Sequence, residues 1–267
     1  MRFLIIGDVM GRVGRKCLQD YLPHARKQYS PDAVIINGEN SAGGFGITES
    51  VYQEFVDLGV DAITSGNHWS DKKEILGFLP QATRLVLPGN MANVEGLHPG
   101  FRVLKSKSSK TFAVINLIGR VFMVNGSKCP FQFVDHILEQ LRDIKVILLD
   151  IHAEASSEKY AIAHYLKGKV SMIWGTHTHV PTADAHILVE KTGFVSDIGM
   201  TGPFDSIIGI KTEASLARFL GDKSKEKTFE TAKKDPWFCA MIVDIDEASG
   251  SCTYLERIIW RQEPLPL

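Results

Sequence analysis

The sequence predicts an α/β fold in which two packed sheets are flanked by helices. Strand-like apolar runs alternate with helix-like amphipathic segments through the first half of the chain, whereas the segments after Ala185 are mostly strand-like. With 267 residues and 44% hydrophobic content, the chain can bury a large core. We therefore expect one domain that spans residues 1–267.

The first half contains short aliphatic runs, each stopped by a glycine or a polar residue, and amphipathic segments between them. The runs predict strands that begin at Arg2, Ala33, Asp61, Val146 and Met172. The segments between them have apolar residues at helical spacing. They predict helices from Gly14 to about Gln28, from a cap at Thr48 to Gly59, and over Ser70–Phe78, Phe133–Leu141 and Ser156–Leu166.

The second half is predicted to add strands over His186–Val189, Phe238–Val243 and Cys252–Ile259. The segment Leu220–Asp235 is rich in charge, and we interpret it as a solvated helix end and loop without an assigned function.

Composition excludes several classes of protein. The formal net charge is −1 and no long basic run is present, so a broad nucleic-acid surface is not expected. The N-terminal apolar run is too short for a signal-peptide core, and no stretch could cross a membrane. The scattered cysteines are typical of reduced thiols, which favours a cytoplasmic protein. They are Cys17, Cys129, Cys239 and Cys252.

Polar side chains follow the strands of the first half at the point where each strand ends. They are Asp8, Glu39 with Asn40, Asn67 with His68, His152, and the pair His177 and His179. Any one of them could be ordinary strand-to-loop punctuation, and the histidine pair alone could be a polar rim. Their repetition at the carboxyl ends of strands, where open α/β sheets place their sites, instead predicts a dinuclear metal site.

The histidine pair is expected to lie in an extended segment. Alternate side chains of such a segment point to opposite faces, so His177 and His179 would share one face and Thr178 would point away.

These motifs together resemble the calcineurin-like metallophosphoesterase superfamily. The runs at residues 37–48, 116–123, 129–131 and 197–203 resemble its bacterial YmdB-type branch, and the similarity extends over the whole chain. The resemblance implies a four-layer αββα sandwich of two mixed sheets flanked by helices. It also implies two transition-metal ions per chain and hydrolysis of cyclic nucleotides, with 2′,3′-cyclic mononucleotides as the expected substrates.

The resemblance also implies roles for individual residues. Asp8, Glu39, Asn40 and His179 would surround one ion, whereas Glu39, Asn67, His152 and His177 would surround the other. Glu39 would bridge the two divalent or trivalent ions, for which iron or manganese is expected and zinc is compatible. His68 would donate a proton to the leaving oxygen, although a structural, hydrogen-bonded histidine is the alternative.

Two positions depart from the wider superfamily. Met10 stands where the superfamily has a histidine ligand, and Glu39 stands where most members have aspartate. Both match the YmdB-type branch, in which Asn40 replaces the missing histidine, although asparagine after Gly-Glu is often only a turn residue. The glycines around Phe45 predict a mobile loop near the site mouth, with Phe45 a candidate base-stacking or subunit contact.

Three functional interpretations stay open at this point. The first is a metal-dependent phosphodiesterase acting on a small cyclic nucleotide. The second is a phosphomonoesterase or nucleotidase on the same metal core. The third is a non-catalytic metal-binding scaffold, which should have eroded ligand positions, and none is eroded here. The sequence leaves a homo-oligomer open.

Overall fold

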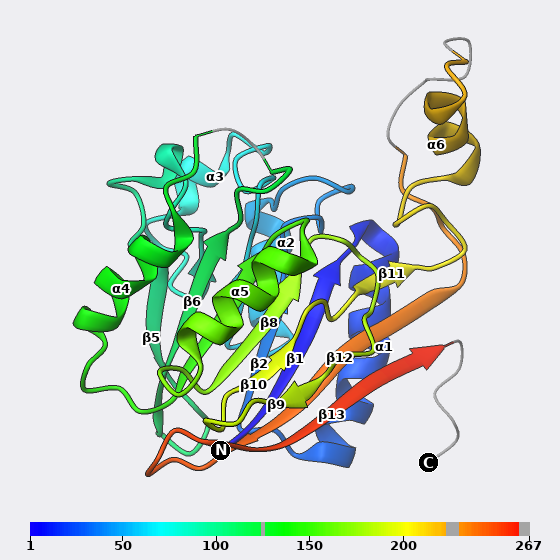
Figure 1. The fold of residues 1–267 in the computed structure, drawn as a ribbon. Coiled ribbons are helices and arrows are strands. Elements are labelled where there is room, and N and C mark those ends of the chain that lie inside the picture. Colours follow the sequence, from blue (N-terminus) through cyan, green and yellow to red (C-terminus); the bar gives the residue numbers. More distant parts are fainter. Residues whose placement is uncertain (124–125, 223–229, 262–267) are drawn as a thin grey trace.

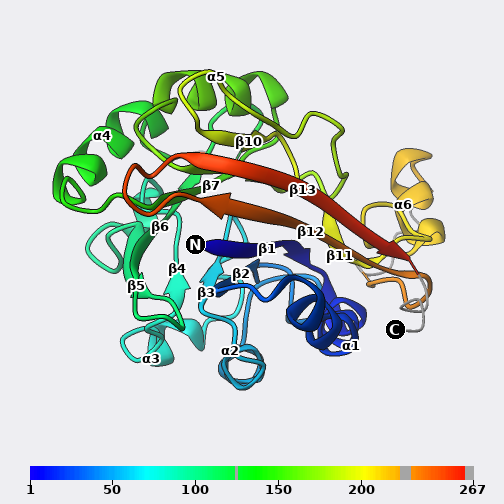
Figure 2. The same cartoon turned by 90° about the horizontal axis from the view of Figure 1, so that it is seen from below.

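Two mixed β-sheets pack face to face and carry helices on their outer faces (Figures 1 and 2). The computed structural model describes residues 1–123, 126–222 and 230–261. Within these residues, the predicted α/β class with two mixed sheets flanked by helices is confirmed.

The first sheet has seven strands in the order β13-β12-β11-β1-β2-β3-β4. They are β1 (Arg2–Val9), β2 (Ala33–Asn37), β3 (Ala62–Thr64), β4 (Leu85–Val86), β11 (Met200–Pro203), β12 (Pro236–Ile245) and β13 (Cys252–Arg261). Strands β1 to β4 are parallel neighbours, and β11 runs parallel to the end of β1. Strand β12 runs antiparallel to β1, β11 and β13.

The second sheet has six strands in the order β5-β6-β7-β8-β10-β9. They are β5 (Phe101–Lys105), β6 (Thr111–Ile118), β7 (Ile147–His152), β8 (Met172–Thr176), β9 (His186–Ile187) and β10 (Gly193–Val195). The central strands β6, β7, β8 and β10 are parallel, whereas β5 and β9 are antiparallel edges.

Helices complete a four-layer arrangement. The first sheet is covered by α1 (Gly11–Tyr29), α2 (Glu49–Asp57), α3 (Ile75–Phe78) and the short η1 (Ala92–Val94), and the second by α4 (Pro130–Gln140) and α5 (Ser156–Leu166) (Figure 2). The sixth helix, α6 (Thr212–Phe219), projects from the body (Figure 1). Strand alternation separates the cores: Leu4 packs toward the helices, whereas Phe3 packs between the sheets.

The predicted elements differ from the structure mainly at their ends. Helix α5 and the Thr48 cap of α2 match the prediction, and the Thr48 hydroxyl accepts a hydrogen bond from the Val51 amide at 3.3 Å. Helix α4 begins at Pro130, because proline suits the first turn of a helix. The predicted helix over Ser70–Phe78 is wrong for its first half, where the Asp71 amide closes a turn on the His68 carbonyl.

Several elements were not predicted, namely α6, η1, the central strand β6 and the short or edge strands β4, β5, β10 and β11. The charge-rich segment Leu220–Asp235 does follow the end of α6, but residues 223–229 lie outside the described part of the chain.

Candidate metal centre

The residues predicted to bind metal come from both sheets. Asp8 ends β1, Glu39 and Asn40 follow β2, and Asn67 follows β3, all in the first sheet. His152 ends β7, and His177 and His179 follow β8, in the second sheet. The carboxyl ends of these strands meet at one end of the sandwich, so the candidate centre lies where the two sheets face each other (Figure 1).

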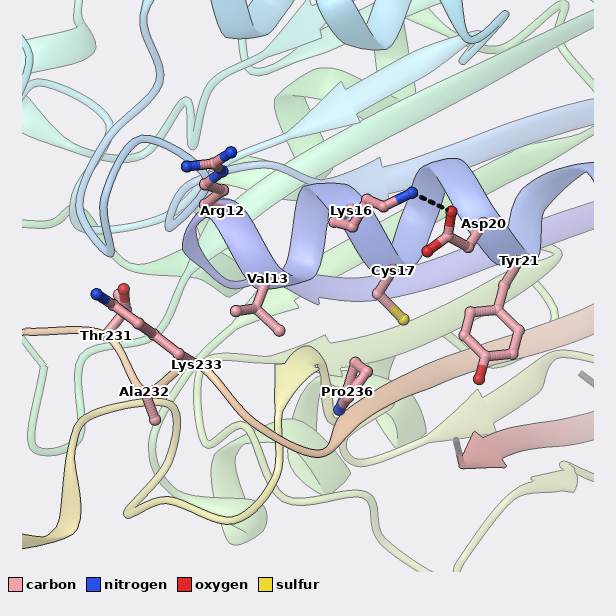
Figure 3. A pocket seen from close by; sticks show the side chains of 10 residues that line it. All are labelled: Arg12, Val13, Lys16, Cys17, Asp20, Tyr21, Thr231, Ala232, Lys233 and Pro236. Atoms are coloured by element: carbon pink, nitrogen blue, oxygen red, sulfur yellow. Dashed lines mark hydrogen bonds and ion pairs between the residues drawn. The ribbon is translucent and has the colours of Figure 1, made fainter. Parts of the chain in front are cut away.

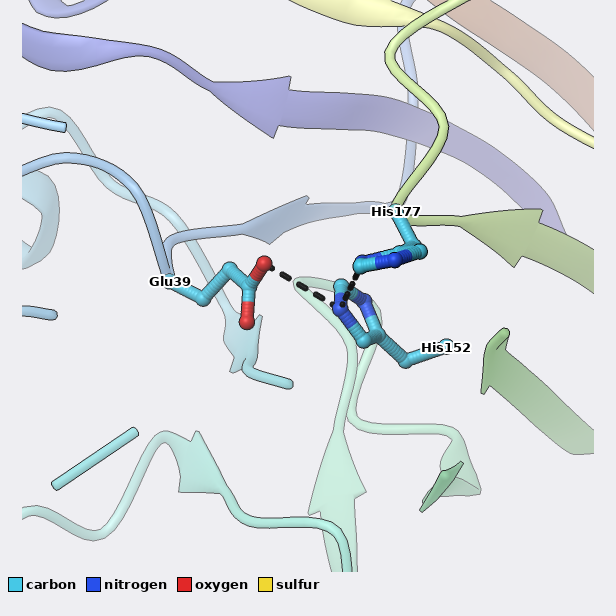
Figure 4. Close-up of side chains that lie close together, drawn as sticks. All are labelled: Glu39, His152 and His177. Carbon is cyan, nitrogen blue, oxygen red and sulfur yellow. Dashed lines mark hydrogen bonds and ion pairs between the residues drawn. The ribbon is translucent and has the colours of Figure 1, made fainter. Parts of the chain in front are cut away.

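The most compact group of ligand atoms surrounds Nε2 of His152. This nitrogen lies 3.1 Å from Oε1 of Glu39, 3.0 Å from Oδ1 of Asn67 and 3.1 Å from Nδ1 of His177. Figure 4 shows the Glu39 carboxylate and the His177 ring approaching it from two sides. Adjacent donor atoms that bind one ion at about 2.1 Å lie about 3 Å apart in an octahedral arrangement. The spacing therefore suits a transition-metal ion.

In His152 and His177, one ring nitrogen has a partner outside the candidate metal site. That partner determines which ring nitrogen is left to bind a metal ion. Nδ1 of His152 lies 2.9 Å from the Thr176 hydroxyl, which itself donates to Oδ1 of Asp150 at 2.7 Å. Nδ1 therefore donates its proton to the hydroxyl, which leaves Nε2 as the nitrogen that could bind a metal ion. Nε2 of His177 faces the Glu154 carboxylate at 3.3 Å, which leaves Nδ1 of His177 for a metal.

Hydrogen bonds alone do not account for the atoms that surround Nε2 of His152. Three acceptors surround Nε2 of His152: a carboxylate oxygen, an amide oxygen and an imidazole nitrogen. A ring nitrogen carries at most one proton, which cannot serve three acceptors at once. A cation in their midst can interact with all four atoms, so the residues present fit a metal ion.

A second group lies beside the first and is less compact. Oδ1 of Asn40 is 3.3 Å from Nε2 of His179, and Oδ1 of Asp8 is 4.0 Å from the same nitrogen. Nδ1 of His179 donates a hydrogen bond to the Ile208 carbonyl at 2.8 Å, so Nε2 is the nitrogen that could bind a metal ion. Oδ1 of Asp8 is buried without a hydrogen-bond partner among the described residues, as expected of a ligand atom.

One backbone hydrogen bond joins the two groups: the His177 amide donates to Oδ2 of Asp8 at 3.3 Å. Over the described part of the chain, no hydrogen bond or ion pair links Glu39 to Asp8, Asn40 or His179, so its predicted bridging role stays a prediction.

The protonation states of the three histidines differ. Burial would lower the pKa of His152, but the neighbouring Glu39 and Asp8 carboxylates outweigh it and raise the pKa, so without a cation this ring holds a proton that a metal ion would replace. Burial lowers the pKa of His177 to about 3 and also lowers that of His179, so both rings are neutral. Burial would raise the pKa of Glu39, but the neighbouring His152 outweighs it and lowers the pKa to about 2. Burial raises the pKa of the Asp8 carboxyl well above its usual range, and a cation would offset that cost.

Gly66 makes the compact group sterically feasible. A side chain at this position would overlap Oε2 of Glu39 and Nε2 of His152. Only glycine lets the backbone after β3 approach these two residues so closely.

His68 differs from its neighbour Asn67 in the direction of its ring. Nδ1 of His68 lies 2.8 Å from Oδ2 of Asp71, and its ring meets the Phe45 ring edge-on at 4.9 Å between centroids. The side chain is 29% exposed and does not contribute to the compact group. Asn67 therefore faces inward, whereas His68 stands at the mouth of the site.

A cavity elsewhere in the molecule is separate from this centre. It has a volume of about 420 Å³ and lies between α1 and residues 231–236, with Cys17 and Tyr21 on its α1 side (Figure 3). None of the predicted metal or catalytic residues lines it.

Comparisons with known proteins identify the family. The chain matches the profile described as YmdB-like protein over residues 4–258. The chain belongs to the YmdB-like family. It is 41% identical over 261 residues to the 2′,3′-cyclic-nucleotide 2′-phosphodiesterase of Bacillus subtilis (strain 168), and the match covers 97% of each chain.

Two solved structures of similar proteins share the fold. A hypothetical protein from Thermus thermophilus is 37% identical, with a TM-score of 0.89 and coverage of 98% of this chain and 100% of that one. A novel phosphatase from Mycoplasma pneumoniae is 30% identical, with a TM-score of 0.91 and coverage of 98% and 93%. The predicted family and enzyme class are confirmed: the chain is a phosphoric ester hydrolase.

The structure shows the surroundings of Met10 and of Asn40, the residue that replaces the missing histidine in the YmdB-type branch. Met10 is 2% exposed and packs in a small apolar cluster with Met200 and Ile210, so it serves as a packing residue. The Asn40 amide nitrogen donates to the Gly44 carbonyl at 3.0 Å, while its oxygen faces His179. Asn40 is therefore both a turn residue and a candidate ligand.

The predicted extended geometry of the histidine pair is wrong. Strand β8 ends at Thr176, and His177 and His179 have φ angles of 96° and 65°. The two rings consequently face different groups, His152 and Asn40 respectively. Non-glycine residues at positive φ are uncommon and concentrate at functional sites.

Contacts from other parts of the chain hold this backbone. One of them involves Asp197, a strand-end acid that the sequence offers as a candidate partner of the ligating histidines. Thr178 donates its amide and hydroxyl to Asp197, which forms a buried ion pair with Lys159 at 2.8 Å. Lys159 also donates to the Thr176 carbonyl at 2.9 Å. A lysine in the middle of a predicted helix gave no sign of this role.

Among the helices that the structure describes, none has the length and apolar character needed to span a membrane.

Glu154 offers a test of the metal-site geometry. Its half-exposed carboxylate is the outer partner of His177, and such partners typically contribute 10–100-fold to metal affinity. We expect Glu154→Gln to weaken metal binding by about that factor, as measured by competition with a chromophoric chelator. Glu190→Gln, at an exposed glutamate that pairs with Lys167, is the control. Unchanged affinity would show that Glu154 does not support a ligand.

Proposed function

We propose that this protein is a dinuclear-metal phosphodiesterase that hydrolyses cyclic nucleotides, with 2′,3′-cyclic mononucleotides as its substrates. The observation that carries the proposal is the group of donor atoms around Nε2 of His152, which adjoins the partly exposed His68. A metal site next to a proton donor is what hydrolysis of a phosphodiester requires. The Bacillus subtilis relative of that name supports the choice of substrate.

In this proposal the residues hold two ions. Glu39, Asn67, His152 and His177 hold one, and Asp8, Asn40 and His179 hold the other, with Glu39 shared between them. The mixed oxygen and nitrogen donors suit manganese or iron, with zinc compatible. Bound metal ions supply the acidity that turns water into a nucleophile and neutralise charge on the phosphoryl oxygens.

The remaining residues position groups and move a proton. Nδ1 of His68 donates to Asp71, so a ring that carries protons on both nitrogens can donate the Nε2 proton to the leaving oxygen of the ester. The His68 amide also donates to Oε2 of Glu39 at 3.2 Å, which fixes the backbone of the proton donor relative to the metal site. Thr176 and Asp150 hold the His152 ring in the orientation that a ligand needs.

A second candidate is phosphomonoester hydrolysis. The solved relative from Mycoplasma pneumoniae is described as a phosphatase. The same metal ligands suit hydrolysis of a phosphomonoester or of a phosphodiester. The two activities differ in whether the phosphoryl group carries one or two ester bonds.

A substrate comparison tests the proposal. Purified protein of measured metal content is assayed with 2′,3′-cyclic AMP and adenosine 3′-monophosphate, and with bis- and mono-p-nitrophenyl phosphate. We expect the diesters to be preferred within both pairs. Chelated protein, and the same protein reloaded with manganese or iron, provide the control, because the water nucleophile depends on the ions. A preference for the monoesters would replace the proposal by the phosphatase, and full activity without metal would reject both.

A further inference from the structure

The loop that follows β6, residues 119–123, is anchored to the candidate site at its first residues. The Gly119 amide donates to the carbonyl of His152 at 2.9 Å. The Arg120 and Val121 amides both donate to the buried Glu158 carboxylate, at distances of 2.9–3.1 Å. The beginning of the loop is therefore fixed to a predicted metal ligand.

The chain that follows the loop is held by residues 90–92. The Ala92 amide donates to the Gly126 carbonyl at 3.1 Å, and the Lys128 amide donates to the Asn90 carbonyl at 2.7 Å. Trp69 directly follows His68 in the sequence, and its ring nitrogen donates to Asn93 at 3.3 Å. The loop therefore begins beside His152 at the carboxyl end of β6, and the chain after it is linked through residues 90–93 to Trp69, the neighbour of His68. We infer that the loop forms part of the rim of the candidate site.

Phe122 lies in this loop with an exposed side chain and a strained backbone conformation. Its side chain is 88% exposed and its φ angle is 61°. Left-handed backbone is rare for a bulky residue, and an exposed aromatic ring gains nothing from packing. In the described part of the chain its ring stacks on no other aromatic ring. Strain that the surrounding structure maintains is typical of functional positions.

We propose that Phe122 determines specificity by stacking on the base of the nucleotide while the phosphate lies at the metal centre. This inference rests on the proposed function and adds the group that recognises the nucleoside. Stacking on an aromatic ring requires no particular hydrogen-bonding pattern, because every base has a π-face. The enzyme accepts several bases in this case and favours purines, whose larger rings stack over more area.

Phe45 has a different position. Its ring already meets the edge of the His68 ring, so a change at Phe45 acts on the proton donor. Phe122 has no such contact, and its truncation acts on binding of the base alone.

The test compares a substrate that has a base with one that lacks it. Phe122→Ala, Phe122→Leu and Phe122→Trp are assayed on 2′,3′-cyclic AMP and on methyl ribofuranoside 2,3-cyclic phosphate. We expect Phe122→Ala to lower kcat/KM for cyclic AMP by about 5- to 100-fold, mostly through KM. The base-free substrate should be hydrolysed as by the wild type. Phe122→Trp should retain the preference for the base, and Phe122→Leu should lose most of it.

Controls separate stacking from structural effects. Val189→Ala truncates an equally exposed apolar side chain in the turn between β9 and β10, and it should change neither substrate. The Tm of the Phe122 variants should equal that of the wild type, because the side chain is exposed. If Phe122→Ala matches the wild type on both substrates, or loses activity equally on both, the role of Phe122 is overturned while the proposed function stands. If the wild type hydrolyses neither cyclic phosphate, the proposed function fails and the role of Phe122 fails with it.

Discussion

Replacement of Asn40 by alanine is expected to remove about one metal equivalent per chain and to lower turnover by more than about 100-fold, beyond the effect of an outer partner. With Met10 packed in an apolar cluster, the second ion of the proposed centre would depend on Asp8, His179 and the neutral Asn40 amide, together with Glu39 if it is shared between the ions. An amide oxygen is a weaker ligand for a transition metal than an imidazole nitrogen. We therefore expect this site to bind its ion weakly, so that loss of one ligand empties it. Metal analysis and initial rates on the same sample measure the effect.

Two variants separate the ligand role of Asn40 from its turn role. Asn40→Asp keeps an oxygen directed at His179 and should retain both metals. Ser41→Ala removes a hydrogen bond of the same turn, from the Ser41 hydroxyl to the Gly38 carbonyl at 2.6 Å, and should have little effect on metal content. His177→Ala should instead empty the compact site. Two retained metals and near-normal turnover in Asn40→Ala would mean that Asn40 is only a turn residue.

The sequence predicted the components of the site better than their geometry. Every predicted ligand lies at the carboxyl end of a strand, because apolar runs that stop at glycine or a polar residue are a local signal. Which sheet each strand joins is not local. The residue patterns before His68 and before His152 look alike, yet the strands that carry them belong to different sheets.

The contacts that orient the ligands were predicted only in part. Asp150, Glu154 and Asp197 are strand-end acids that the sequence offers as outer partners of the histidines, whereas the backbone contacts gave no such signal. The carbonyl of Ile208 fixes the ring of His179 across 29 positions of the chain, and a backbone carbonyl has no signature in a sequence. The left-handed backbone at His177 has the same character: it depends on Asp197 and Lys159, which come from other elements. Edge strands such as β5 were missed because their half-exposed side chains lack a continuous apolar run.

The proposed proton-donor role of His68 rests on the position of its ring, which lies outside the two candidate groups of metal ligands. Asp71 accepts from Nδ1 at 2.8 Å, which leaves Nε2 without a partner among the described residues. A ligand would instead have one ring nitrogen directed at the donor atoms of Glu39, Asn67 and His177. Loss of the His68 ring should therefore leave the metal groups intact.

His68→Ala is expected to keep both metals and to lower turnover of cyclic nucleotides by about 10²–10⁴-fold, the usual range for loss of a general acid. The loss should shrink for bis-p-nitrophenyl phosphate, because p-nitrophenolate is a stable leaving group that needs little protonation. His164→Ala, at an exposed histidine of α5, should change neither value. The measurement that checks this prediction is the metal content of His68→Ala together with its turnover rate on the same sample. If the two fall together in His68→Ala, the ring binds metal, and the proton must come from another group at the mouth of the site.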